Sequence, residues 1–130
     1  MVPFAEGGGT VTLLAPWRGG WLVGTNAGEW GGSLYIATPS NKIPLAKGNV
    51  LGGFTWRGHF YVLSGLNHLT LNEGELWEVD LRAERLVRRI SLPAMPKDVF
   101  ITRDQHLIVR TSKGDIALLP DGAVAPPGKL

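Results

Sequence analysis

A pattern of paired apolar segments recurs along the chain with a spacing of about forty residues. In each copy an apolar segment is followed by a polar or glycine-containing turn and by a second segment that begins after glycine. Leu34, Leu76 and Ile116 hold corresponding places in the three copies and lie 42 and 40 residues apart. A repeat of this length constrains the fold, because every copy must form a similar unit that stacks on its neighbours.

Each copy divides into four segments with the composition of short β-strands. β-Branched and apolar residues fill these segments, and Gly, Pro and Asn separate them, as is typical of strands and turns. The expected strands are residues 10–15, 21–26, 33–38 and 42–46, then 49–54, 59–65, 75–80 and 86–92, and finally 98–102, 106–112, 115–119 and 123–125. Pro44 has no backbone N–H to donate, so residues 42–46 are expected at a sheet edge.

Residues 80–93 are the segment in which helix and strand compete. Their Leu, Arg, Ala and Glu residues favour a helix, and Asp80 could begin one. The passage also resembles the third-strand, turn and fourth-strand part of YVTN-, NHL- and PQQ-type β-propeller repeats. In those repeats Val-Asp, here Val79-Asp80, precedes a polar turn, and a strand closes on Ile-Ser-Leu-Pro, here residues 90–93. We therefore expect a turn through Ala83 and Glu84 and an outer strand.

Four strands in about forty residues are the size of one propeller blade. The chain is predicted to be an all-β, single propeller-like domain spanning residues 1–130, with three four-stranded antiparallel blade-like repeats. The repeats are expected at about 9–48, 49–96 and 97–130. The resemblance implies a partial β-propeller or half of a six-bladed dimeric propeller. The chain has no Trp-Asp signature and no PQQ-type repeat ending, so the resemblance implies no catalytic residue.

Three blades pose a problem of closure. Propellers close with roughly four to eight blades, and an incomplete ring leaves two sheet faces uncovered, which soluble monomers rarely tolerate when those faces are apolar. Pairing of two chains would cover both faces, so we predict a homo-oligomer, most simply a dimer. An irregular closure within one chain, or further blades on a longer natural chain, would also solve the problem.

Composition limits the classes of function. The 130 residues include no cysteine, which excludes disulfides and thiol chemistry, and they contain no apolar run long enough for a membrane-spanning helix. The net charge is only +2, and no aromatic residues are interleaved among the arginines at 82, 85, 88 and 89, so nucleic acid is not favoured as a partner. Two cellular locations are compatible with the sequence: the cytoplasm, or the periplasm or cell exterior if an export signal has been removed.

The charged and histidine residues do not match a known catalytic or metal-binding motif. His59, His68 and His106 have no metal-ligand spacing, and no phosphate-binding or nucleophile motif occurs. We therefore expect no metal, no cofactor and no catalytic residue. Glu78 and Asp80 share one face of a strand, which we interpret as a solvated surface. The four arginines are interpreted as charges that protect an outer strand from aggregation, the alternative being contacts to phosphate or to an acidic partner.

The connections between the second and third strands differ most among the copies. The third is short, whereas the first contains Glu29 and Trp30 and the second runs through residues 67–73. Stacking of the repeats does not require long connections, so the length of the first two loops indicates a function. Trp30 is a candidate anchor for a partner, although it could instead fold back over the sheet edge. The predicted binding residues are Glu29, Trp30, Asn67, His68, Asn72 and Glu73.

These features favour a non-catalytic binding module that acts through loops on one face of a propeller-like scaffold. Its partner would be a protein, as for an inhibitor or immunity-type protein, or a small ligand. An alternative is a small-molecule enzyme of the lactonase or sugar-dehydrogenase type. The expected innermost strands contain Asn49 and Asp98 and few other polar residues, which favours the binding module. A third possibility is that the chain forms a blade set of a larger propeller.

Overall fold

The computed structural model describes residues 9–68 and 71–126, with only the backbone of His68 included. Strands make up most of the described chain, with one short 3₁₀ helix, η2, between the second and third strands. The elements are β1 (Thr10–Trp17), β2 (Gly20–Asn26), η2 (Gly28–Trp30), β3 (Ser33–Ala37), β4 (Lys42–Lys47), β5 (Val50–Trp56), β6 (His59–His68), β7 (Leu71–Asp80), β8 (Arg85–Leu92), β9 (Pro96–Ile101), β10 (Leu107–Thr111), β11 (Gly114–Leu118) and β12 (Val124–Ala125).

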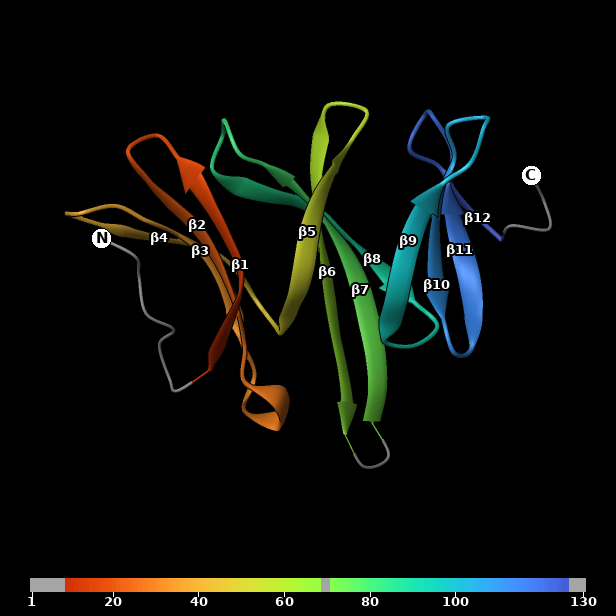
Figure 1. Cartoon of the computed structure of the whole chain (residues 1–130), viewed down its shortest axis with the longest axis horizontal. Coiled ribbons are helices and arrows are strands. Elements are labelled where there is room, and N and C mark those ends of the chain that lie inside the picture. The colour runs from red at the N-terminus through yellow and green to blue at the C-terminus, as the bar shows by residue number, and fades with distance from the viewer. Residues whose placement is uncertain (1–8, 69–70, 127–130) are drawn as a thin grey trace.

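The strands form three four-stranded antiparallel sheets, which confirms the predicted fold class. The first sheet is β1–β4, the second β5–β8 and the third β9–β12, and within each sheet the strands lie side by side in chain order. Figure 1 shows the three sheets following one another from the N-terminal to the C-terminal side of the molecule. None of the three described sheets closes on itself into a barrel. Each copy of the repeat is therefore one sheet.

The ambiguous segment after Asp80 is a turn and a strand, as expected. The carboxylate of Asp80 accepts a hydrogen bond from the backbone N–H of Ala83 at 3.0 Å, and the N–H of Glu84 donates to the carbonyl of Leu81 at 3.2 Å. Strand β8 then pairs along β7 up to Leu92. Helix propensity is overridden here because pairing with β7 buries Ile90 and Leu92.

Two apolar clusters hold the sheets together. Between the first and second sheets, Leu22 and Ile36 pack against Val62 and Trp77. Between the second and third sheets, residues including Leu76 pack against three buried side chains of β10 and β11, which are Leu107, Val109 and Leu118. The second sheet therefore buries both of its faces, as its doubly apolar strand β6 predicted.

The third copy is offset by one residue relative to the predicted alignment. Leu34 belongs to the cluster with the following sheet, and so does Leu76. Ile116 instead packs on the cluster shared with the preceding sheet. Side chains alternate along a strand, so a shift of one residue reverses the face. The equivalence of Ile116 with Leu34 and Leu76 is therefore wrong in three dimensions.

The two outward faces of the stack differ in polarity. On the first sheet, Leu14 pairs with Val23 and Val23 with Tyr35, which places all three on the face turned away from the second sheet. Val23 and Tyr35 are nearly inaccessible, while Leu14 is 38% exposed. On the third sheet the outward face carries Arg110, which lies 5.2 Å from the ring of Phe100 and 3.9 Å from the carboxylate of Asp115. The C-terminal face is thus the more polar one.

No helix in the described part of the chain is long and apolar enough to cross a membrane.

Candidate functional site

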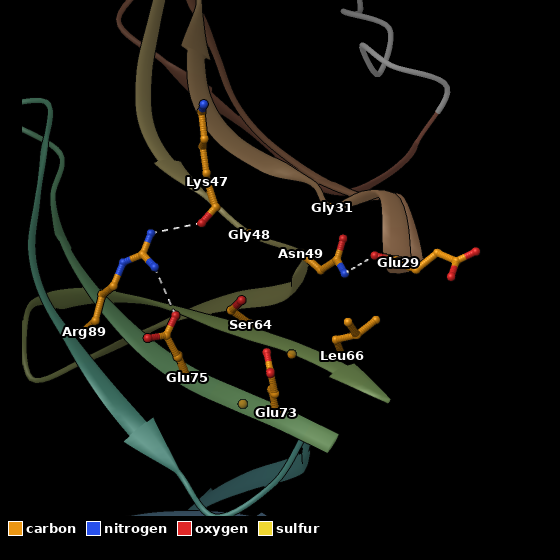
Figure 2. Close-up of a pocket in the computed structure, with 13 residues that line it drawn as sticks. Glu29, Gly31, Lys47, Gly48, Asn49, Ser64, Leu66, Glu73, Glu75 and Arg89 are labelled. Carbon is orange, nitrogen blue, oxygen red and sulfur yellow. Dashed lines mark hydrogen bonds and ion pairs between the residues drawn. The ribbon is translucent and has the colours of Figure 1, made fainter. Parts of the chain in front are cut away.

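A cavity of about 290 Å³ opens between the first and second sheets, at the end of the molecule that carries η2. Figure 2 shows it bounded by the η2 turn, by the connection from β4 to β5, and by the strands β6 and β7. Its charged and polar side chains come from these segments and from β4 and β8: Glu29, Lys47, Asn49, Ser64, Glu73, Glu75 and Arg89. The cavity therefore exists only because two sheets are stacked.

Glycines shape the η2 turn on one side of the cavity. Gly28 and Gly31 have φ values of 58° and 80°, in the left-handed region that glycine adopts most readily. The N–H of Trp30 donates to the carbonyl of Ala27 at 3.1 Å, and that of Gly28 donates to the side-chain oxygen of Asn26 at 2.9 Å. The turn is therefore held by its own hydrogen bonds.

Asn49 attaches this turn to the connection between the sheets. Its side chain is buried, with the residue 5% exposed. Its amide nitrogen donates to the carbonyl of Gly28 at 2.7 Å, and its Oδ1 accepts from the N–H of Ala27 at 3.0 Å. One side chain thus satisfies two backbone groups of the turn, and it fixes the turn relative to the second sheet.

Trp30 extends away from the protein at the tip of this turn. It is 84% exposed, more than any other large hydrophobic side chain in the described residues. The alternative in which Trp30 folds back over the sheet edge is therefore wrong. Exposure of a whole indole ring costs free energy in water. A rigid turn that holds the ring in this position has no packing purpose within the described chain.

Arg89 and Glu75 are ion-paired beside the cavity (Figure 2). The guanidinium of Arg89 lies 3.2 Å from the Glu75 carboxylate and donates to the carbonyl of Lys47 at 2.9 Å. The same carboxylate accepts from the indole Nε1 of Trp77 at 3.1 Å, and the Arg89 guanidinium lies 5.0 Å from the Trp77 ring. These contacts join the first sheet to the second, so Arg89 has a structural role.

The structure brings Glu29 and Glu73 to this cavity and places Trp30 next to it. Glu29 and Glu73 come from different sheets, as the predicted common loop face requires. Within the described residues, no three His, Asp or Glu side chains are close enough together to hold a metal ion. Sequence reasoning did not assign Asn49 to this site, because a buried Asn between two strands resembles the start of the next strand.

The prediction of a second long loop at residues 67–73 is wrong, because most of this segment is paired strand. Strand β6 continues to His68 and β7 begins at Leu71, with Asn67 opposite Asn72. Its polar residues suggested a loop, but a two-stranded ribbon that extends beyond its sheet also exposes polar residues to water. Asn72 accepts a hydrogen bond from the N–H of Met95 at 2.8 Å, which ties it to the connection between the second and third sheets. Asn67 is exposed and does not line the cavity. The His68 side chain lies outside the described residues.

Glu78 is not the solvated surface residue that strand alternation suggested. Its side chain is only 14% exposed and accepts from Nε of Arg88 at 2.9 Å, with His59 Nδ1 at 3.6 Å from its other oxygen. Burial raises the pKa of the neighbouring Tyr61 hydroxyl, and the negative charge of Glu78 raises that pKa further. The interpretation failed because this face of the second sheet packs against the third sheet. The opposite charges of Glu78 and Arg88, which pair across β7 and β8, were the available signal.

No protein-family model matches the chain, and no curated protein matches it.

Proposed function

We propose that this chain is a non-catalytic binding module that engages a protein partner through Trp30 and the adjoining cavity. The single observation that carries this proposal is the 84% exposure of Trp30 on a turn fixed by the buried Asn49. Tryptophan is enriched among the residues that dominate binding energies at protein interfaces. An anchor that is already held in position also loses less conformational entropy on binding.

The groups around Trp30 define the kind of partner surface that fits. Glu29, Lys47 and Glu73 line the cavity, and the positive charge of Arg89 is offset by Glu75. An apolar hollow that accepts the indole ring, with polar groups at its edge, would complement this surface. The charged groups at the edge of the cavity would mainly affect the rate of association and the choice of partner.

The enzyme alternative finds less support in the same cavity. Glu75 and Arg89 already hold each other and the surrounding backbone, and Asn49 is committed to the η2 turn. A catalytic acid, base or nucleophile must be able to reach a substrate atom. The side chain that is best placed to reach another molecule is an indole, which supplies contact area rather than reactivity.

The proposal is tested by comparing the wild-type chain with Trp30→Ala. Each is immobilised and exposed to extract from the source cells, and any retained protein is purified and titrated against both forms. Truncation of a true anchor costs at least about 2 kcal/mol, so the dissociation constant should rise at least about thirtyfold. The free energy of unfolding should change by less than about 0.5 kcal/mol, because the ring is exposed.

Arg103→Ala is the matched control, since Arg103 is an exposed side chain in a turn of the third sheet. It should leave binding unchanged. Equal binding by the wild type and Trp30→Ala would reject Trp30 as the anchor and this end of the molecule as the interface.

A further inference from the structure

A second and larger cavity, of about 590 Å³, lies at the opposite end of the same pair of sheets. The residues that line it come from the end of β1, the β5–β6 hairpin and the β7–β8 turn. Figure 1 shows these turns along one edge of the molecule and η2 along the other. The second cavity is therefore separate from the surface around Trp30.

The structure divides the arginine group at 82, 85, 88 and 89 into two pairs with different roles. Arg88 and Arg89 form ion pairs with Glu78 and Glu75. Arg82 and Arg85 are exposed, line the second cavity, and form no ion pair with any described residue. Only the first pair therefore forms ion pairs within the fold, and both residues of the second pair line the cavity.

The acidic residues near this cavity are already engaged. Glu78 accepts from Arg88, and Glu84 lies 3.6 Å from Arg18 of the first sheet. Asp80, which is opposite Arg85 across the two strands, accepts from the N–H of Ala83. The cavity is lined by Arg82, Arg85, Glu78 and Asp80, and Glu78 is already paired with Arg88 outside the lining, which leaves one excess positive charge for a ligand.

The remaining walls of the cavity are aromatic and aliphatic. They comprise Trp17 from the first sheet and, from the second sheet, Phe60, Val79, Leu81 and Val87. The indole Nε1 of Trp17 is buried and has no hydrogen-bond acceptor in the described part of the chain. Pockets for organic ligands combine such apolar walls with a few polar groups that set the orientation.

We propose that this cavity binds a small amphiphilic organic anion, with an acidic head at Arg82 and Arg85 and an aromatic or branched apolar body against Trp17 and Phe60. The planar guanidinium group donates two parallel hydrogen bonds to a carboxylate or a phosphate, which makes arginine the favoured residue for such heads. A volume of about 590 Å³ lies within the usual range for small-molecule sites. This site is independent of the proposed interface at Trp30.

The proposal is tested on the ¹⁵N-labelled full chain by titration with 1-naphthoate, followed by the indole N–H signal of Trp17. A Trp17→Phe variant assigns that signal among the five tryptophans. Naphthalene-1-methanol has the same body without the charge, and inorganic phosphate has the charge without the body. A parallel titration with 1-naphthyl phosphate distinguishes carboxylates from phosphate esters as the preferred head.

We expect saturable binding of at least one naphthyl anion with a shift of the Trp17 signal. The double variant Arg82→Ala/Arg85→Ala should bind it at least about tenfold more weakly, because hydrogen bonds to charged groups are the stronger ones. Arg103→Ala, an exposed arginine at the same end of the third sheet, should bind like the wild type. Circular dichroism and the melting temperature verify that each variant is folded.

Four outcomes would overturn the proposal. They are the absence of saturable binding, equal affinity for the uncharged alcohol, equal affinity of the double variant, and equal affinity for inorganic phosphate. The second would show an apolar hollow without an anion site. The last would show a basic surface in which the aromatic walls take no part.

Discussion

At the residue scale, asparagine side chains connect the sheets of this protein. Asn49 satisfies two backbone groups of the η2 turn, and Asn72 accepts from the N–H of Met95 in the next inter-sheet connection. An amide side chain suits this task because it donates and accepts at once, as a backbone group does. Asn49 thus lies where the chain leaves the first sheet, and Asn72, within β7, binds the connection to the third sheet.

Replacement of Asn49 by alanine should destabilise the protein by about 2 kcal/mol. The substitution removes the acceptor of the partly buried Ala27 N–H and one of the two hydrogen bonds to the carbonyl of Gly28, which keeps the bond from the N–H of Gly31 at 3.0 Å. A polar group left unsatisfied in a buried position costs about 1–3 kcal/mol. Urea unfolding measures the change. Asn67→Ala, at an exposed strand position, should stay within about 0.5 kcal/mol of the wild type. Equal stability of the two variants would mean that the η2 turn does not depend on Asn49.

At the element scale, glycines in the strands allow other backbone segments to approach closely. A Cβ atom at Gly74 of β7 would lie 2.1 Å from the carbonyl oxygen of Ala94, in the connection between the second and third sheets. A Cβ atom at Gly20 of β2 would lie 2.2 Å from the carbonyl oxygen of Ala37. These glycines are required for contact rather than for an unusual backbone conformation, because neither has a positive φ.

Gly74→Ala should therefore cost more than about 3 kcal/mol, since the atom in the way belongs to the backbone and cannot rotate aside. Gly52→Ala is the matched control within the same sheet, because a Cβ atom there meets no other atom within 4 Å. It should be neutral or stabilise by up to about 1 kcal/mol, through loss of flexibility in the unfolded chain. Thermal unfolding of both variants gives the comparison. Similar melting temperatures would show that the β8–β9 connection can move away from β7.

Elements with a strong local pattern could be predicted from the sequence, whereas contacts between distant strands could not. Strand β8 followed from Val79-Asp80 and from the Ile-Ser-Leu-Pro ending, despite its helix-favouring composition. The ribbon at the end of β6 and β7 did not, because polar residues in a solvated ribbon have the composition of a loop. The offset of Ile116 was also hidden, since a spacing of about forty residues does not show which face a side chain occupies.

The candidate site was predicted in part for the same reason. Trp30, Glu29 and Glu73 were found because a large aromatic residue and charges stand out in a turn or beside it. Asn49 was missed, because its two partners in the η2 turn lie more than twenty residues away. The different roles of Arg85 and Arg89 do not follow from the strand register. Arg89 lies opposite Trp77 and pairs with Glu75, whereas Arg85 lies opposite Asp80 and forms no ion pair with a described residue.

At the scale of the whole molecule, the order of the sheets defines how further copies could be added. The second sheet turns the face that carries Val62 towards the first sheet, and the third sheet turns the corresponding face, with Val109, towards the second sheet. The first sheet carries the corresponding residue, Val23, on its outward face. In an assembly of two chains, the outward face of the third sheet would contact the outward face of the first sheet of the other chain. The contacting surface of the third sheet carries Phe100, Arg110 and Asp115.

We expect two chains to associate through these two faces, which would complete a six-sheet ring with twofold symmetry. A standard interface buries about 800 Å² on each partner. The Arg110–Asp115 pair would lose water on association, which weakens the contact. Sedimentation should therefore show a concentration-dependent dimer of the 14.0 kDa chain.

Leu14→Glu should shift this equilibrium to the monomer, because Leu14 is 38% exposed on the outward face of the first sheet and a buried glutamate there would have no partner. Leu71→Glu places the same charge on the exposed β6–β7 ribbon, so it should sediment like the wild type. A wild-type chain that stays at 14.0 kDa up to about 100 µM would rule out the ring, since that concentration limit corresponds to a binding free energy weaker than about −5.5 kcal/mol. A dimer that persists in Leu14→Glu would instead place the interface elsewhere. The polar outward face of the third sheet would then be the end of the stack, as in repeat proteins whose terminal units face water.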